Sequence, residues 1–215
     1  CNHIENVSNS KLGDAATIFC ASSSTTLEFA YEDSSDPKFL AASDIYEWRI
    51  REISKRVVAS SYPPTSARKQ GVQAVYTSRM TNTIRAAIVE PGQYLGGKVN
   101  VLIPNTGVST FLLAAILNSK VVNFWYREKF AMQHMQGGAL PVNTTDLELV
   151  PLPRDIEVWR ELEDLSQRAF HADESLDELR NRIDDLVFVL FKISSADKEI
   201  IDNRYAEYLG AKNLG

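Results

Sequence analysis

Cysteine and histidine are scarce in this sequence. Its 215 residues include two cysteines, Cys1 and Cys20, and three histidines, His3, His134 and His171. The cysteines do not have the spacing of metal ligands, and two are too few for a disulfide framework. The histidines are scattered, and none has a second histidine four residues away or a cysteine nearby. These absences exclude a zinc module and a disulfide scaffold, and they favour a reducing, cytoplasmic environment.

Long hydrophobic runs are also missing. The longest apolar stretch, Phe111–Leu117, is far below the roughly 18 residues of a membrane span, so we expect no membrane partner. Asn2–Lys11 is polar, where a signal peptide would have an apolar segment. The hydrophobic share of 44% still suffices for one good-sized domain, or for one domain with a helical appendage. Because the sequence starts with Cys1 in a polar stretch instead of Met, we expect a piece of a longer protein.

The motifs of catalysis are absent too. Gly96-Gly97 is an isolated pair rather than a phosphate-binding loop, and no serine stands in a Gly-x-Ser-x-Gly context. Ser61-Tyr62-Pro63-Pro64 has its prolines in the wrong order for the Asn-Pro-Pro-aromatic motif of amino-methylating enzymes. Acidic pairs such as Asp184-Asp185 lie on the polar face of a predicted helix, which is typical of solvated surface. The sequence therefore predicts a non-catalytic chain with no metal site and no cofactor of its own.

Charge is distributed unevenly, although the formal net charge is only −5. Residues 151–215 hold nine Lys/Arg and fifteen Asp/Glu, whereas residues 49–98 hold nine Lys/Arg and two acidic residues, Glu52 and Glu90. The basic residues of that middle segment are Arg49, Arg51, Lys55, Arg56, Arg68, Lys69, Arg79, Arg85 and Lys98. A basic middle and an acidic tail are typical of a protein with one nucleic-acid-binding face. An ordinary solvated surface is the alternative that composition alone leaves open.

The first 153 residues have the pattern of a mostly β module with supporting helices, which places the chain in the α+β class. Short apolar stretches bounded by turn-forming residues predict strands over Ala15–Cys20, Lys38–Ile45, Thr83–Val89, Gly97–Ile103 and Leu140–Val142. A helix should begin after Ser109 as N-cap, pause at Asn118-Ser119 and resume over Lys120–Met132. Trp125 lies on the apolar face of the second helix, which favours the core over base stacking.

From residue 154 onward the apolar period changes to alternating steps of three and four. The seam consists of Leu162, Leu165, Ala169, Ala172, Leu176, Leu179, Ile183, Leu186, Leu190 and Ile193. This is the heptad pattern of a coiled coil, and one straight helix over it would be about 48 Å long at roughly 1.5 Å per residue. A pair of helices packed on their own domain, broken near His171–Glu174, fits the same pattern. A last helix is predicted over Ser195–Leu209, with Ser195 as N-cap. We therefore divide the chain into 1–153 and a helical region, 154–215, which serves as a spacer or docking element.

Several segments, in order, resemble a known family. They are Leu112–Arg127, Gly137–Leu140, Asp146–Pro153, Ile183–Ile193 and Asp197–Ile201, with weaker matches at Lys11–Ala16, Pro37–Leu40 and Asp44-Ile45. Together they resemble the C-terminal target-recognition domains of type IIG restriction–modification enzymes and adenine-N6 DNA methyltransferases, which are related to type I specificity subunits. Two departures concern loops expected near DNA, because Ala21–Thr26 lacks the usual glycine and Pro141-Val142-Asn143 replaces a basic strand.

The resemblance implies sequence-specific recognition of double-stranded DNA by a non-catalytic domain. Its partners would be DNA and the methyltransferase or endonuclease lobe of a parent enzyme, and S-adenosylmethionine and magnesium would be bound only in that parent. Basic residues would hold phosphates, and planar or amide side chains would contact bases. The candidate DNA-binding residues are Arg49, Arg51, Lys55, Arg68, Lys69, Gln70, Arg79, Asn82, Arg85, Lys98, Gln133, His134 and Gln136.

Two other functions stay open at this point. In the first, the chain is an interaction module that docks a partner subunit, or a second copy of itself, through the heptad helix. In the second, it is an enzyme whose site is assembled from residues too dispersed to recognise in one sequence. Tight protein association without DNA affinity would indicate the former, and an apolar pocket holding perturbed acids the latter.

Overall fold

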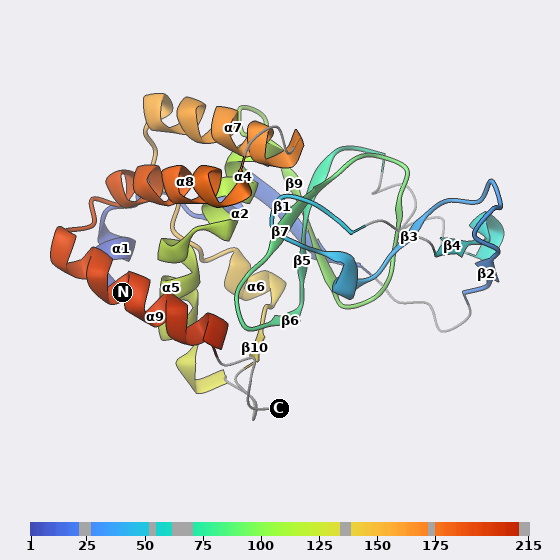
Figure 1. Ribbon diagram of the computed structural model, residues 1–215, viewed down its shortest axis with the longest axis horizontal. Coiled ribbons are helices and arrows are strands. Elements are labelled where there is room, and N and C mark those ends of the chain that lie inside the picture. The colour runs from blue at the N-terminus through green and yellow to red at the C-terminus, as the bar shows by residue number, and fades with distance from the viewer. Residues whose placement is uncertain (22–26, 52–54, 62–70, 134–138, 172–174, 211–215) are drawn as a thin grey trace.

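Helices and strands separate along the long axis of the molecule, as Figure 1 shows for the computed structural model. The structure describes residues 1–21, 27–51, 55–61, 71–133, 139–171 and 175–210, with the side chain of Gln133 left out. Three C-terminal helices lie at one end, a four-stranded sheet lies in the middle, and a lobe of short strands forms the other end. The expected α+β class is confirmed.

The central sheet is antiparallel throughout. It contains β1 (Ala16–Cys20), β9 (Val99–Pro104), β5 (Ala74–Ser78) and β7 (Ala86–Val89), in the order β1-β9-β5-β7. The strands predicted over Ala15–Cys20 and Thr83–Val89 were found as β1 and β7, each shorter than predicted. The strand predicted over Gly97–Ile103 was found as β9. The central strand β5 was missed, because its first four residues are all buried and therefore show no polar alternation.

Both faces of the sheet are covered. Alternate residues of β9 point to opposite sides, so that Val99 and Val101 join one apolar cluster and Leu102 joins the other. The larger cluster lies under the helices, and the smaller one lies on the side of Leu40 and Ile45. The sheet is thus a fixed layer whose ends, rather than its faces, are available to a ligand.

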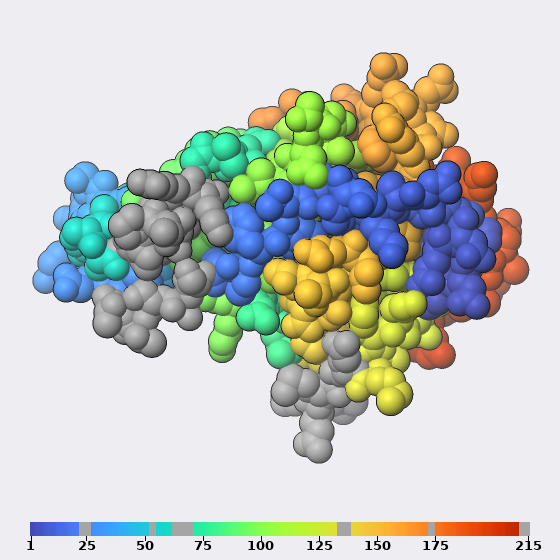
Figure 2. All heavy atoms as spheres, turned by 180° about the vertical axis from the view of Figure 1, so that it is seen from behind, coloured from blue at the N-terminus to red at the C-terminus, as the bar shows by residue number. Residues whose placement is uncertain are grey.

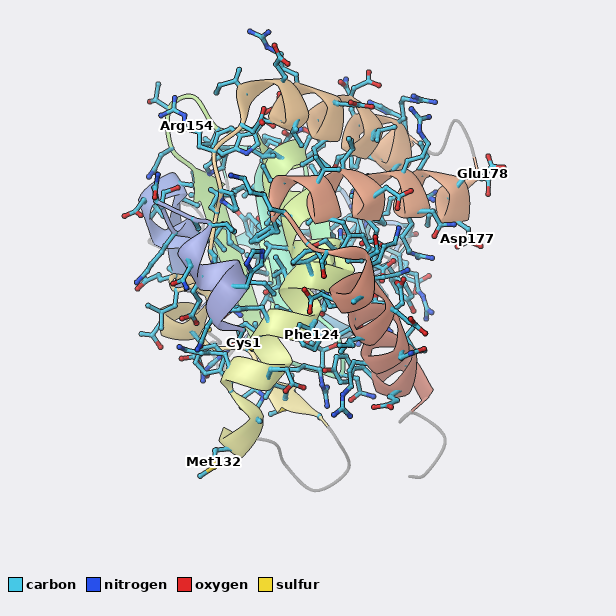
Figure 3. All side chains as sticks on the ribbon, turned by 90° about the vertical axis from the view of Figure 1, so that its left-hand side faces the viewer. Cys1, Phe124, Met132, Arg154, Asp177 and Glu178 are labelled. Carbon is cyan, nitrogen blue, oxygen red and sulfur yellow. The ribbon has the colours of Figure 1, made fainter. Side chains whose placement is uncertain are left out.

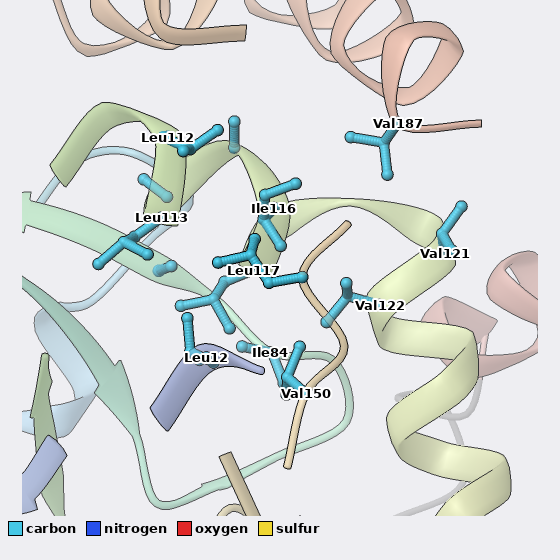
Figure 4. Packing of buried hydrophobic residues seen from close by; sticks show 14 of the residues in the cluster. Leu12, Ile84, Leu112, Leu113, Ile116, Leu117, Val121, Val122, Val150 and Val187 are labelled. Carbon is cyan, nitrogen blue, oxygen red and sulfur yellow. The ribbon is translucent and has the colours of Figure 1, made fainter. Parts of the chain in front are cut away.

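Helix α4 (Thr110–Asn118) packs on the sheet on the larger cluster's side, and helix α5 (Lys120–Lys129) follows directly after it. Ser109 caps α4 by accepting a hydrogen bond from the Leu112 backbone N–H at 3.1 Å, as predicted. Ser119 ends α4 and caps α5, accepting from the Val122 N–H at 3.3 Å. Figure 4 shows the apolar side chains of both helices meeting those of distant segments, among them Leu12 and Val150.

The heptad seam packs into the chain's own core. The helix ends at His171 in α7 (Ile156–His171) and resumes at Leu176 in α8 (Leu176–Leu190), so the single straight helix is not formed. Seam residues such as Leu162, Leu179 and Ile183 are fully buried in the larger cluster. This cluster includes residues from both sides of residue 153, so the two expected regions share one core.

The last helix, α9 (Ser195–Gly210), packs across α5. Its N-cap is Ser194 rather than the predicted Ser195, because the Ser194 hydroxyl accepts from the Asp197 N–H at 3.2 Å. Acidic side chains labelled at the start of α8, Asp177 and Glu178, project outward in Figure 3. No helix among the described residues is long and apolar enough to cross a membrane.

Short elements complete the chain. They are α1 (Asn2–Asn6), α2 (Leu12–Ala15), α6 (Thr144–Leu147), β2 (Phe29–Ala30), β3 (Phe39–Leu40), β4 (Arg56–Val57), β6 (Met80–Thr81), β8 (Tyr94–Leu95), β10 (Leu140–Pro141) and the 3-10 turns Ala42–Asp44, Ala59–Ser61 and Ala131–Gln133. β2 pairs with β4, β3 with β8 and β10 with β6.

Two of the segments that carry the resemblance, Lys11–Ala16 and Asp146–Pro153, are joined by backbone hydrogen bonds. The Leu12 N–H donates to the Val150 carbonyl at 2.8 Å, and the Gly13 N–H donates to the Glu148 carbonyl at 3.1 Å. A Cβ atom at Gly13 would lie 3.1 Å from Cβ of Glu148, which explains the glycine at this position. In Figure 2 the N-terminal segment, in blue, crosses the back of the molecule beside this yellow-orange segment. The start of the chain therefore closes the core that the helices cover.

The expectation that Asp184 lies on a solvated helix face is wrong, because its carboxylate is buried in the core and has a raised pKa. Asp184 of α8 accepts a hydrogen bond from the Lys120 backbone N–H at 2.8 Å, at the start of α5, and only 4% of its side chain is exposed. Burial raises the pKa of Asp184 from 3.8 to about 6, although the Lys120 N–H and ammonium favour the charged form. The folded chain therefore binds this proton more tightly than the unfolded chain does.

We expect the stability of the chain to respond to pH through this residue. Because the folded pKa of Asp184 is raised, its stabilising effect is complete below about pH 4 and is lost as the pH rises through about 6. Relative to Asp184→Asn, the wild type should lose about 2 kcal/mol of unfolding free energy between pH 4.5 and 7.5. Urea unfolding of both chains at the two pH values measures this. Parallel pH profiles would contradict the assignment.

Candidate nucleic-acid interface

The strand register brings three separate basic residues to one end of the sheet. Cys20 of β1 pairs with Asn100 of β9, Ser78 of β5 pairs with Val99, and Thr77 pairs with Ala86 of β7. The residues that adjoin these strand ends are Lys98 before β9, Arg79 after β5 and Arg85 before β7. With neighbouring strands about 4.8 Å apart, the four strand ends span roughly 14 Å. We call Arg79, Arg85 and Lys98 the basic edge.

The backbone of the basic edge is fixed while two of its side chains are exposed. The Arg79 N–H donates to the Lys98 carbonyl at 2.9 Å, and the Arg79 carbonyl accepts from the Val142 N–H at 2.8 Å. Lys98 has a φ of 66°, a left-handed conformation that turns its side chain out of the strand. Neither side chain forms an ion pair with a described residue. Both charges are thus available to an anionic ligand.

Asn118 fixes the position of Arg85. Its side-chain oxygen accepts from the Ala86 N–H at 2.8 Å, and its side-chain nitrogen donates to the Ala86 carbonyl at 2.9 Å. The amide therefore pairs with the start of β7 as a neighbouring strand would. Asn118 belongs to the Leu-Asn-Ser-Lys segment of the resemblance, so that segment has a structural role immediately beside a basic-edge residue.

Tyr46 joins Arg85 to a second arginine. The Cζ atom of Arg85 lies 5.7 Å from the centroid of the Tyr46 ring, and the Cζ atom of Arg51 lies 4.8 Å from it. The Arg51 guanidinium also donates a hydrogen bond to the Tyr46 hydroxyl. Sequence reasoning missed Tyr46, because residues 46 and 85 meet only through the fold. An aromatic residue close to a run of basic residues was the one available signal.

The remaining predicted residues are dispersed or lie outside the description. Lys55 is exposed in the lobe of short strands, and Arg49 is half-buried in the turn after Tyr46. Asn82 is half-buried, and its carbonyl accepts a hydrogen bond from Arg127 at 2.5 Å. Arg68, Lys69, Gln70, His134, Gln136 and the side chain of Gln133 lie outside the described residues.

Two residues with other expected roles are placed by the structure. Arg56, part of the basic segment, donates to the Glu32 carbonyl at 2.7 Å and to the Asp36 carbonyl at 2.5 Å, so its guanidinium holds the lobe together. Trp125, which the sequence places in the core rather than in base stacking, is 1% exposed and belongs to the core. Among the described residues, no group of three or more His, Cys, Asp or Glu side chains could hold a metal ion.

Comparisons with known proteins find a similar fold among solved structures. No family model and no curated protein matches the sequence. Among solved structures, the type IIL restriction-modification enzyme MmeI in complex with DNA aligns with 96% of this chain at 10% identity, with a TM-score of 0.59. This chain shares its fold with part of MmeI. The alignment covers 37% of the MmeI chain.

Two type I proteins align with lower TM-scores than MmeI does. The HsdS subunit from Thermoanaerobacter tengcongensis aligns with 89% of this chain and 49% of its own length, at 16% identity and a TM-score of 0.48. The S subunit from M. genitalium aligns with 88% of this chain and 46% of its own length, at 14% identity and a TM-score of 0.47. The chain therefore spans less than half the length of each of these proteins, MmeI included.

Proposed function

We propose that this chain recognises double-stranded DNA as the target-recognition part of a restriction–modification enzyme. The observation that carries the proposal is the basic edge, where three strands of one rigid sheet each place a basic residue at the same end. The fold shared with part of MmeI, whose structure contains DNA, supports it. A regular array of cations on a fixed frame suits the regular phosphates of a duplex.

The residues of the basic edge would divide the work of recognition. Lys98 is a compact charge and would contact a phosphate, which sets register without selecting sequence. Arg79 has the planar fork that can pair with a guanine edge, and such a pair discriminates by about 1–3 kcal/mol. The predicted loop residues outside the description would supply further base contacts from the segments 62–70 and 134–138. Ala139 follows the second of these segments and precedes β10. Strand β10 pairs with β6, and β6 begins immediately after Arg79.

The chemistry of modification would belong to the rest of the parent protein. We propose a methyltransferase or endonuclease lobe as the protein partner, and that lobe would bind S-adenosylmethionine and magnesium in the cytoplasm. The alternative, docking of a partner through a heptad helix, has less support, because seam residues such as Leu165 and Ile183 are covered by the chain's own core.

Selection from a random pool of duplex DNA tests the proposal. The chain would be incubated with the pool at low and at moderate salt, and the retained DNA would be sequenced. We expect a short enriched motif and an affinity that falls steeply as salt rises, because bound phosphates release counterions. Salt-dependent binding without a motif would mean that sequence selection requires the parent lobe together with this chain. Absence of binding even at low salt would overturn the proposal.

A further inference from the structure

Two arginines converge on one aromatic ring at the edge of the candidate interface. Arg51 follows the turn that carries Tyr46, and Arg85 comes from the start of β7, yet both guanidinium groups lie against the Tyr46 ring at 4.8 and 5.7 Å. Two cations brought together repel each other, and the negative face of an aromatic ring offsets part of this repulsion. Arg51 is exposed and Arg85 is half-buried, so both can still reach a ligand.

The turn that carries Tyr46 is held at each of the next two residues. Glu47 accepts hydrogen bonds from the Arg180 guanidinium of α8, one of them at 3.0 Å from Nε. The Trp48 N–H donates to the Ala86 carbonyl at 2.8 Å, and the Trp48 carbonyl accepts from the Ile88 N–H at 3.2 Å. Trp48 has a φ of 60°, which is strained for a bulky residue and persists only where the surroundings fix it. The Tyr46 ring therefore stands on a rigid support.

Open space borders this ring. A hollow of about 200 Å³ is lined by Tyr46, Glu47, Arg85, Leu176 and Arg180, where the turn meets the start of α8. The Glu47 carboxylate in this hollow is already paired with Arg180. Arg85 and Arg51 have no such carboxylate partner among the described residues. An anion approaching the ring would thus meet two guanidinium groups that are held in place and not neutralised.

We propose that Tyr46 is a positioning residue that presents Arg51 and Arg85 together to one phosphate group of the DNA backbone. The inference rests on the proposed function and deepens it, because it assigns a contact that selects no base. Guanidinium groups match the oxygens of a phosphate through paired, charge-assisted hydrogen bonds. Side chains that are ordered before binding lose less freedom when they bind, so the ring raises affinity without adding charge.

A double-mutant cycle tests the role of Tyr46. The duplex affinities of the wild type, Tyr46→Leu, Arg51→Gln/Arg85→Gln and the triple variant would be measured at several salt concentrations. Tyr46→Leu should lower affinity about tenfold, because both guanidinium groups lose the ring that orders them before binding. It should also make the salt dependence shallower, although it removes no charge. In the Arg51→Gln/Arg85→Gln background, Tyr46→Leu should not change the duplex affinity further. In the background with both arginines, Tyr46→Phe should keep an affinity near that of the wild type because it keeps the ring.

A second variant makes the test independent of how well Tyr46→Leu folds. Arg180→Met frees Glu47 from α8 and should weaken duplex binding only while Arg51 and Arg85 are present. Equal losses in both arginine backgrounds would indicate a merely structural role and overturn the inference, as would unchanged affinity in Tyr46→Leu. If the wild type itself shows no salt-dependent duplex binding, the proposed function fails as well, and this outcome is distinct because it appears before any substitution.

Discussion

Replacing Arg79, Arg85 and Lys98 together by glutamine should lower the affinity for duplex DNA about a hundredfold, at roughly 1 kcal/mol or more for each lost contact. The slope of log affinity against log salt should become shallower by about 2, since Arg85 and Lys98 would each lose a phosphate contact that contributes about 0.9. Glutamine removes the charge but keeps a polar side chain, and the strand ends that carry these positions are fixed by backbone hydrogen bonds. Electrophoretic or fluorescence titration at three or more salt concentrations measures both quantities.

A matched control changes the same charge elsewhere. Arg154, Arg160 and Lys192 are exposed, and they lie at the end of the α7–α8 pair that is remote from Tyr46. The 15 residues of α8 separate Lys192 from the basic edge by about 20 Å at 1.5 Å per residue. Arg154→Gln/Arg160→Gln/Lys192→Gln should therefore leave affinity within about twofold. If both triple variants lost affinity equally, net charge rather than the basic edge would govern binding.

Replacing Asn118 by leucine should lower the unfolding free energy by about 2 kcal/mol, because it leaves the buried Ala86 N–H without its acceptor. Asn118 is 3% exposed, so the Ala86 N–H cannot turn to water instead, whereas the Ala86 carbonyl keeps the Trp48 N–H at 2.8 Å. A buried polar group left without a partner costs about 1–3 kcal/mol, and one such group is left here. For a chain of this size the melting temperature should fall by about 4–8 °C.

The comparison for this prediction is an exposed asparagine. Asn181 lies on the outer side of α8, and Asn181→Leu should alter the unfolding free energy by less than about 0.5 kcal/mol. Urea unfolding followed by circular dichroism measures both variants. A loss of less than 1 kcal/mol in Asn118→Leu would show that β7 does not depend on this side chain.

The sequence allowed the prediction of elements whose signals are local. Ser109 and Ser119 cap helices, and each cap needs only the next three residues. The uneven charge of residues 49–98 also indicated a basic face, and the strand register explains why three of those residues meet at one end of the sheet. Turn residues and alternation located β1 and β9 for the same reason.

Features that depend on distant contacts could not be predicted in this way. The seam of residues 162–193 requires a narrow apolar stripe whether the helix packs on a partner or on its own domain, so the pattern cannot distinguish the two. The role of Tyr46 depends on Arg85, and that of Asn118 on Ala86, across 39 and 32 residues in the sequence. Strand β5 is buried on both faces and therefore lacks the alternation that marked β9.

The shared core of the two regions has a consequence for synthesis on the ribosome. Leu117 packs in the same cluster as Phe191 and Ile201, which are translated much later. At about 5–20 residues per second, the helix that carries Leu117 would wait roughly 4–17 s for its last neighbours. During this interval a wholly buried helix face would be uncovered, which is the condition under which nascent chains recruit chaperones. Folding of the central sheet and its covering helices is therefore expected to finish only after the acidic helices have left the exit tunnel.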